Sequence, residues 1–249
     1  MKPAINTAII IIGVLTTHFG FSQTITLGYG PAYTTTKQVV PLVNGNSGGL
    51  SGMQTAYVVS LRYEQFLPNN HCSLFTAYSK FDGYTFMFFE KEGVAEGIGY
   101  VDGVGYNGVS INRLDFGAGY RLAQKRKQFY FRPFLALGVQ ISKKNNEEIY
   151  NSLLNANGPS YFQLVPVSAT PINTIQITPC GGFNAVFVFW RRLDVGLSFQ
   201  GVLGFKPYQK MYFKYEYKGV PQATAEFEAN GTGLFVTLGI GYRFENFIK

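Results

Sequence analysis

Charged residues, cysteine and histidine are all scarce in this 249-residue sequence. Only 14% of the residues are charged, and there are two cysteines and two histidines. With 46% hydrophobic residues, the chain is too apolar for a disordered protein, which combines low hydrophobicity with high charge. The formal net charge is +7, but the basic residues are scattered and form no basic helix. This distribution argues against a nucleic-acid partner.

Long apolar runs are also missing after residue 22, so no transmembrane helix is expected there. The start of the chain has the features of an export signal. Lys2 is followed by the apolar stretch 8–15 and by a small-residue cleavage site at 20–22. The apolar stretch is too short to span a bilayer, which makes an uncleaved anchor the less favoured alternative. We therefore expect a signal peptide over 1–22 and one exported domain over 23–249.

Glycine and aromatic residues are plentiful instead, at 29 residues and 16% of the chain. They occur in windows in which apolar and polar or small residues alternate with a period of two, the pattern of a β-strand with one apolar face. In the last window, "LFVTLGIGYRF", every second residue from Leu234 to Phe244 is apolar. Together with looser windows, this pattern predicts about eight strands, over 24–33, 56–66, 73–89, 112–122, 129–141, 180–190, 193–205 and 234–244.

The predicted connections alternate between long and short. Segments 34–55, 91–108 and 145–175 are long, whereas 68–71 and 191–192 are short. Short turns at one end and long loops at the other are expected of an up-and-down meander whose ends face different compartments. The chain is therefore predicted to form a single all-β domain.

The two faces of the predicted strands differ sharply in chemistry. One face is almost entirely Leu, Val, Ile, Phe and Tyr, while the other carries arginines, carboxylates and glycines. A charge buried in a dry core is costly unless it is paired, whereas a closed barrel in a membrane turns its apolar face to lipid and satisfies its backbone hydrogen bonds. We therefore predict a closed up-and-down antiparallel transmembrane β-barrel, with a soluble lipocalin-like or avidin-like cup as the alternative. The polar cluster in its lumen would consist of Arg62, Glu64, Arg113, Asp115, Arg121, Arg132, Asp194 and Arg243.

With an export signal, eight alternating strands and the final strand "LGIGYRF", the sequence resembles the small outer-membrane barrels of Gram-negative bacteria, the OmpA-barrel, OmpX, OmpW and PorT-like group. The resemblance implies a location in the cell outer membrane. It also implies that Tyr242 and Phe244 form the insertion signal read by the barrel-assembly machinery. The alternative is that these two aromatics only belong to an interfacial girdle. The residues 245–249, "ENFIK", depart from the family pattern, in which the aromatic residue is the last one.

Two cysteines in an exported protein would by default form a disulfide. In the predicted topology, however, Cys72 starts a strand at the periplasmic end and Cys180 starts one near the outer rim. An apolar band about 25 Å tall would separate them, and a disulfide needs Cα atoms within about 7 Å. We therefore expect two thiols.

No catalytic, cofactor or metal site is indicated, and the protein is expected not to be an enzyme. His71, the only histidine after the signal, is placed in a short turn without a Ser or Asp partner. The stretch 103–108, "GVGYNG", spells a dinucleotide fingerprint but lies outside any βαβ unit. The lumen charges are interpreted as a paired polar plug, because eight strands enclose little more than their own side chains. A gated ion path is the alternative.

The expected function lies in the extracellular loops, in adhesion, envelope integrity or a surface or secretion assembly. The outer hairpin over 210–229, with Phe213, Lys214, Tyr215, Glu216 and Tyr217, is predicted to offer a sheet edge to a protein partner; a solvated hairpin without a partner is the alternative. Lys143 and Lys144 are candidates for contact with lipopolysaccharide phosphates. The alternative function is that of an OmpW-like passive transporter of small apolar solutes. An apolar upper lumen around Val186 and Val188 would favour this transporter.

Overall fold

A computed structural model shows an all-β chain. The structure describes residues 22–40, 54–67, 71–90, 100–122, 128–144, 149–150, 162–190, 192–217 and 220–244. The expected signal peptide, apart from Ser22, and the tail 245–249 lie outside these residues. The strands are β1 (Gln23–Val40), β2 (Gln54–Phe66), β3 (Cys72–Glu90), β4 (Tyr100–Tyr120), β5 (Phe129–Lys144), β6 (Ile149–Tyr150), β7 (Phe162–Pro171), β8 (Thr174–Phe189), β9 (Leu193–Val202), β10 (Gln209–Tyr217), β11 (Val220–Pro221) and β12 (Ala225–Phe244). Among the described residues, no helix has the length and apolar character needed to cross a membrane.

Eight of these strands close into an antiparallel barrel. The order is β1-β2-β3-β4-β5-β8-β9-β12, and β12 pairs with β1 to close the ring. Each neighbour in the ring is the next barrel strand along the chain, so the meander and the strand number predicted from the sequence are confirmed. Closure gives every strand of the ring two neighbours, as a barrel in hydrocarbon requires.

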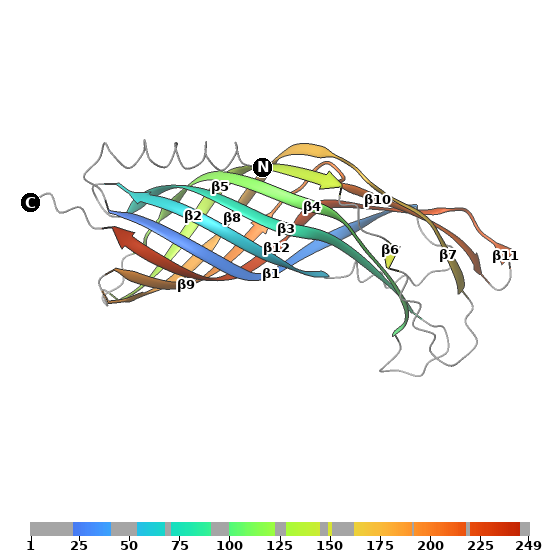
Figure 1. Cartoon of the computed structure of the whole chain (residues 1–249), viewed down its shortest axis with the longest axis horizontal. Helices are drawn as coiled ribbons and strands as arrows, with labels where there is room; N and C mark the ends of the chain where they lie inside the picture. The colour runs from blue at the N-terminus through green and yellow to red at the C-terminus, as the bar shows by residue number, and fades with distance from the viewer. Residues whose placement is uncertain are drawn as a thin grey trace, which may run out of the picture.

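The two ends of the barrel are different (Figure 1). At one end, on the left in Figure 1, short turns join β2 to β3, β4 to β5 and β8 to β9; this is called the short-turn end. At the other, long-strand end, several strands continue beyond the ring. There β10 pairs with β12 on one side and with β7 on the other, and the pairing of β3 with β4 extends as far as Glu90 and Tyr100. The stretch 103–108, which the sequence analysis included in a long connection, is part of β4 there.

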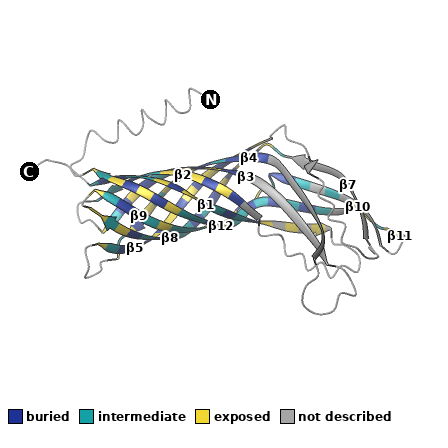
Figure 2. Cartoon of the chain, turned by 60° about the horizontal axis from the view of Figure 1, so that its bottom comes forward, coloured by how far each residue is buried: buried dark blue, intermediate teal, exposed yellow. Residues whose placement is uncertain are grey.

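The outer surface of the ring is apolar. Exposed and buried side chains alternate along much of the barrel wall (Figure 2). The exposed ones include the large apolar residues Leu27, Leu61, Leu74, Phe116, Leu135, Ile177, Leu197, Leu238 and Ile240. The buried ones include Glu64, Arg113, Asp115, Arg132 and Asp194. Apolar residues outside and charges inside are the reverse of a soluble barrel, so the ring is a transmembrane β-barrel.

The apolar belt has the height of a membrane. On β12 the outward residues from Leu234 to Phe244 are all apolar. Ten residue steps at about 3.4 Å each, on a strand tilted by about 40°, span about 26 Å along the barrel axis, close to the ~25 Å apolar band of such barrels. Above this belt the outward residues include the charged Lys37 on β1 and Glu228 on β12.

Strand β3, whose faces the sequence did not assign, has aromatic residues on both sides of the wall. Phe75 and Phe81 are buried in the lumen, while Leu74 and Tyr78 are exposed. This explains why its hydrophobic pattern does not alternate.

Candidate functional site: the polar lumen

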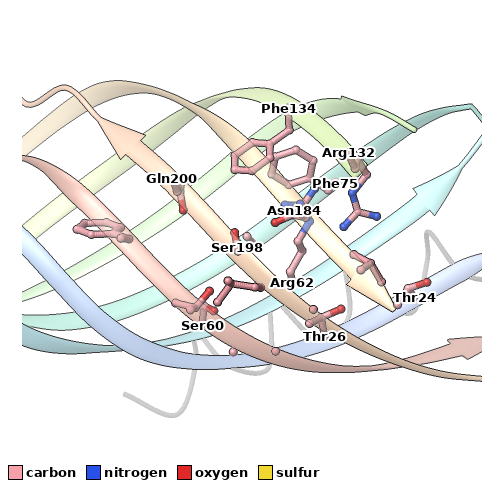
Figure 3. A pocket seen from close by; sticks show the side chains of 18 of the residues that line it. Thr24, Thr26, Ser60, Arg62, Phe75, Arg132, Phe134, Asn184, Ser198 and Gln200 are labelled. Carbon is pink, nitrogen blue, oxygen red and sulfur yellow. The ribbon is translucent and has the colours of Figure 1, made fainter. Parts of the chain in front are cut away.

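A small cavity lies inside the ring, bounded by residues of all eight barrel strands. Its volume is about 80 Å³, which is room for only a few water molecules. Figure 3 shows Arg62 beside Asn184, with Ser60, Ser198 and Thr26 lining the adjacent space. The Arg62 guanidinium lies over the Phe75 ring, 3.6 Å from its centroid. The lumen is thus nearly filled by the protein's own side chains.

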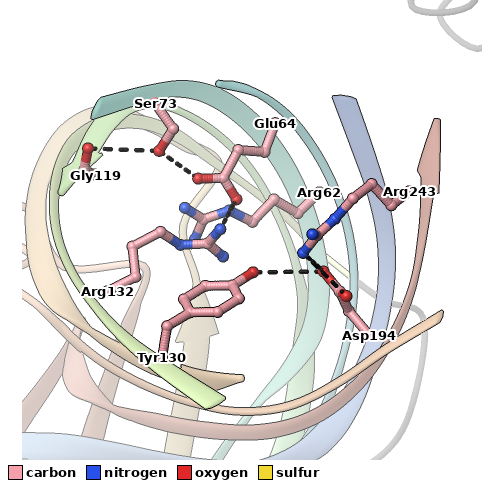
Figure 4. A network of polar contacts seen from close by, with 8 residues as sticks. All are labelled: Arg62, Glu64, Ser73, Gly119, Tyr130, Arg132, Asp194 and Arg243. Carbon is pink, nitrogen blue, oxygen red and sulfur yellow. Dashed lines mark hydrogen bonds and ion pairs between the residues drawn. The ribbon is translucent and has the colours of Figure 1, made fainter. Parts of the chain in front are cut away.

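Glu64 is the centre of the first polar group, near the short-turn end (Figure 4). Its carboxylate forms ion pairs with Arg132 and, at 3.5 Å, with Arg62, and it accepts a hydrogen bond from the Ser73 hydroxyl. The Glu64 side chain is only 3% exposed. Strands β2, β3 and β5 are therefore linked across the lumen through one carboxylate.

Asp194 is the centre of a second group at the same end. Its two oxygens accept hydrogen bonds of 3.1 and 2.8 Å from one guanidinium nitrogen of Arg243. The Tyr130 hydroxyl donates a hydrogen bond to Asp194 Oδ2 at 3.4 Å. The Arg121 guanidinium lies over the Tyr130 ring, 4.2 Å from its centroid. This group connects β5, β9 and β12 (Figure 4).

Asp115 is the centre of a third group, farther into the lumen. Its Oδ1 is 2.7 Å from an Arg113 nitrogen, and Gln200 Nε2 donates to its Oδ2 at 3.3 Å. The Cys180 thiol lies 3.9 Å from Asp115 Oδ1 and accepts from Gln200 Nε2 at 3.2 Å. Arg113 is 1% exposed, so this pair is fully removed from water.

The structure places all eight residues of the expected polar cluster in these three groups. Each of the three carboxylates faces at least one arginine, and the five arginines give the described part of the lumen an excess of two positive charges. The sequence analysis identified these eight residues from the alternation along each strand, because successive residues of a strand point to opposite faces of the wall. It did not identify their partners Ser73, Tyr130, Asn184 and Gln200, although parity on β5 and β9 places Tyr130 and Gln200 on the same inward face.

The two cysteines lie in different parts of the barrel, and no disulfide joins them. Cys72 is in register with Tyr120 at the short-turn end. Cys180 is buried in the lumen beside Asp115, and not at the outer rim where the sequence analysis placed it. Val186 and Val188 also differ from expectation, since they pair with Gly196 and Asp194 at the short-turn end. They therefore do not form an apolar upper lumen.

Several solved structures of outer-membrane proteins are similar to this chain. No protein-family model and no curated protein matches the sequence. Among solved structures, the chain is similar to the outer membrane protein OprG from Pseudomonas aeruginosa, with 10% identity over 92% of this chain and 98% of that chain and a TM-score of 0.47. It is also similar to a major outer membrane protein from Thermus thermophilus (9% identity, 91% and 100% covered, TM-score 0.48) and to the outer membrane protease OmpT from Escherichia coli (13%, 92% and 100%, 0.41).

The two aromatic residues at the end of β12 lie on the outer surface of the barrel. Tyr242 and Phe244 are each 43% exposed, and their rings pack edge to face with centroids 4.9 Å apart. Both positions fit an interfacial girdle, and their role as an insertion signal remains a prediction. His71 is exposed in the turn before β3, and its ring stacks on Tyr120.

The outer hairpin contains a surface charge group. Lys210 Nζ lies 3.1 Å from Glu226 Oε1 and 2.5 Å from Glu228 Oε1. Hydrogen bonds to Glu228 and Glu226 raise the pKa of Lys210 above its ordinary value. Lys214 is exposed. Among the described residues no group of three or more His, Cys, Asp and Glu side chains could hold a metal ion.

Proposed function

We propose that this protein is a non-enzymatic outer-membrane barrel whose transmembrane part is a closed anchor and whose extracellular strands carry the function, in adhesion, envelope integrity or a surface assembly. The observation that supports this most strongly is the paired lumen. Each of three buried carboxylates is paired with an arginine, and the cavity among the described lumen side chains has a volume of about 80 Å³. A chain of paired charges that fills the lumen stabilises a closed wall and leaves no continuous path for solute.

The extension at the long-strand end is the part we propose to meet a partner. We place it on the extracellular side, because short turns face the periplasm in such barrels. The sequence analysis expected the free sheet edge on the hairpin 210–229. In the structure, however, β10 is already paired with β7 along Gln209–Tyr217 and with β12 along Gln209–Phe213. The edge that could accept an added strand is therefore on β7, whose only register pairing within the described part of the chain is with β10.

A crosslinking experiment in living cells tests this proposal. A photoreactive amino acid replaces Lys214 or Thr224, which are both exposed on the extension, and the control places it at Leu238 in the lipid belt. The proposal predicts that one protein partner is captured from the two outer positions and none from Leu238. Equal capture from all three positions, or none from any of them, would count against a partner at this surface.

A second candidate function, passage of small apolar solutes sideways through the wall, is favoured by one interruption in the barrel. Strand β8 pairs with β9 only from Cys180 to Phe189. Beyond this, Leu203 N donates to Pro179 O at 3.0 Å, and the next backbone hydrogen bond is from Ile172 N to Tyr208 O. The ladder between β8 and the chain after β9 is therefore incomplete near the long-strand end.

Gln176 bridges this interruption. Its Oε1 accepts hydrogen bonds of 2.8 Å from the backbone N–H groups of Phe205 and Lys206, and its Nε2 donates to Asn230 O at 2.9 Å. If the seam is a passage, Gln176→Ala should raise the release of a small apolar dye from vesicles, and Ser79→Ala, a buried lumen change on β3 away from the seam, should not. Release at the wild-type rate in both variants would remove this candidate.

A further inference from the structure

The outer wall of the barrel has a depression where two glycines lie side by side. Gly181 on β8 and Gly201 on β9 are in register, and alternation along both strands places them on the lipid side. Because neither has a side chain, the wall is hollowed there. The resulting groove has a volume of about 590 Å³.

The groove is apolar along its sides and lies within the lipid belt. Its walls include Leu135, which is 75% exposed, together with Leu203 and Leu234. Toward the short-turn end, the next outward-facing register pair is Phe183 with Phe199, whose rings are stacked. At the opposite end the groove meets Thr35 and Thr232, where Thr35 Oγ1 donates to Thr232 O at 3.2 Å. The groove thus has apolar sides within the belt and a polar rim at Thr35 and Thr232.

We propose that this groove binds an acyl chain of a membrane lipid, seated on Gly181 and Gly201. The belt that surrounds it faces hydrocarbon, so lipid chains are the molecules in contact with its mouth. An elongated apolar depression offers a chain more contact than the convex wall around it. The polar rim lies at the level where the belt ends and charged residues such as Lys37 begin, which is where a lipid head group would lie. The proposal needs only a barrel in a membrane and is independent of the extracellular function.

Photolabelling in vesicles tests this site. The full chain is reconstituted into vesicles of phosphatidylethanolamine and phosphatidylglycerol that contain a phosphatidylethanolamine with a diazirine in one acyl chain. After irradiation, the labelled residues are mapped by peptide mass spectrometry. We expect labelling of 179–181 and 201–203 to exceed that of other belt positions several-fold.

Gly201→Phe fills the groove and should reduce this labelling to the level of the belt. A Cβ at Gly201 meets only Gly181 O, at an ordinary 3.7 Å, so the variant should insert normally; Gly201→Leu serves if it does not. Leu238→Phe adds an aromatic ring elsewhere on the belt and should leave the labelling unchanged. Uniform labelling in the wild type, or undiminished labelling in Gly201→Phe, would overturn the proposal. Crosslinks between two copies of the chain at 179–181 and 201–203 would also overturn it, since they would assign the groove to a dimer contact.

Discussion

Replacing Glu64 by Gln tests whether the buried charges in the lumen stabilise the barrel by pairing with one another. The change keeps the size of the side chain but removes the charge that faces Arg132 and Arg62. Both partners are largely buried, with the Arg132 side chain 6% exposed and that of Arg62 13% exposed. Breaking a buried pair by removing one partner costs about 3–5 kcal/mol, because the other charge is left uncompensated.

The variant can be measured by urea unfolding of the barrel from lipid vesicles. With a slope of about 2 kcal/mol per molar urea, a loss of this size lowers the midpoint by about 2 M. Combining Glu64→Gln with Arg132→Met should recover much of the loss, since the second change removes the charge that was left unpaired. Glu228→Gln, outside the membrane, is the matched control and should have a much smaller effect. If Glu64→Gln is as mild as this control, the lumen charges are hydrated and the closed-lumen account is wrong.

Three further predictions follow from the same geometry. Gly182→Val should abolish the heat-modifiable gel shift of a folded barrel, because a Cβ there overlaps the Phe199 backbone; a normal shift would contradict the packing between β8 and β9. The raised pKa of Lys210 keeps its ion pairs complete at pH values below the ordinary lysine pKa of about 10.4, and they are lost only as the pH rises through the higher folded value. Hydrogen exchange of the β10–β12 pairing, corrected for intrinsic rates, should therefore not change between about pH 7 and about pH 10; faster opening within that range would count against this pairing. Deleting 245–249 should leave insertion into the outer membrane intact if Phe244 carries the insertion signal. Lost insertion would show that the barrel-assembly machinery recognises the tail itself.

The barrel could be predicted from the sequence because its two faces have opposite chemistry. Over 113–120 on β4 and 236–244 on β12 apolar residues alternate without a break with polar or small ones, and this pattern identified both the strands and the inward arginines. On β3 the same reasoning did not assign a face, since Phe75 fills the lumen while Leu74 faces lipid. Inward aromatics of this kind pack beneath arginines, as Phe75 does beneath Arg62, and no single-strand pattern reveals such a contact.

The features that the sequence did not reveal depend on pairing between distant strands. That Lys210 lies between Glu226 and Glu228 follows from the register of β10 with β12, and the occupied edge of β10 follows from β7, which the sequence analysis treated as loop. The groove over Gly181 and Gly201 likewise exists only because the two glycines are in register. Register is fixed by the closed ring as a whole and cannot be read from one strand at a time.

Ion conductance across a planar bilayer tests the central claim, a barrel closed by its own paired charges, most directly. The account predicts that the reconstituted wild-type protein adds no steady conductance above that of the bare bilayer. Stable, stepwise openings that change in size with Arg132→Met or Asp194→Asn would show a hydrated path through the polar lumen and would contradict it.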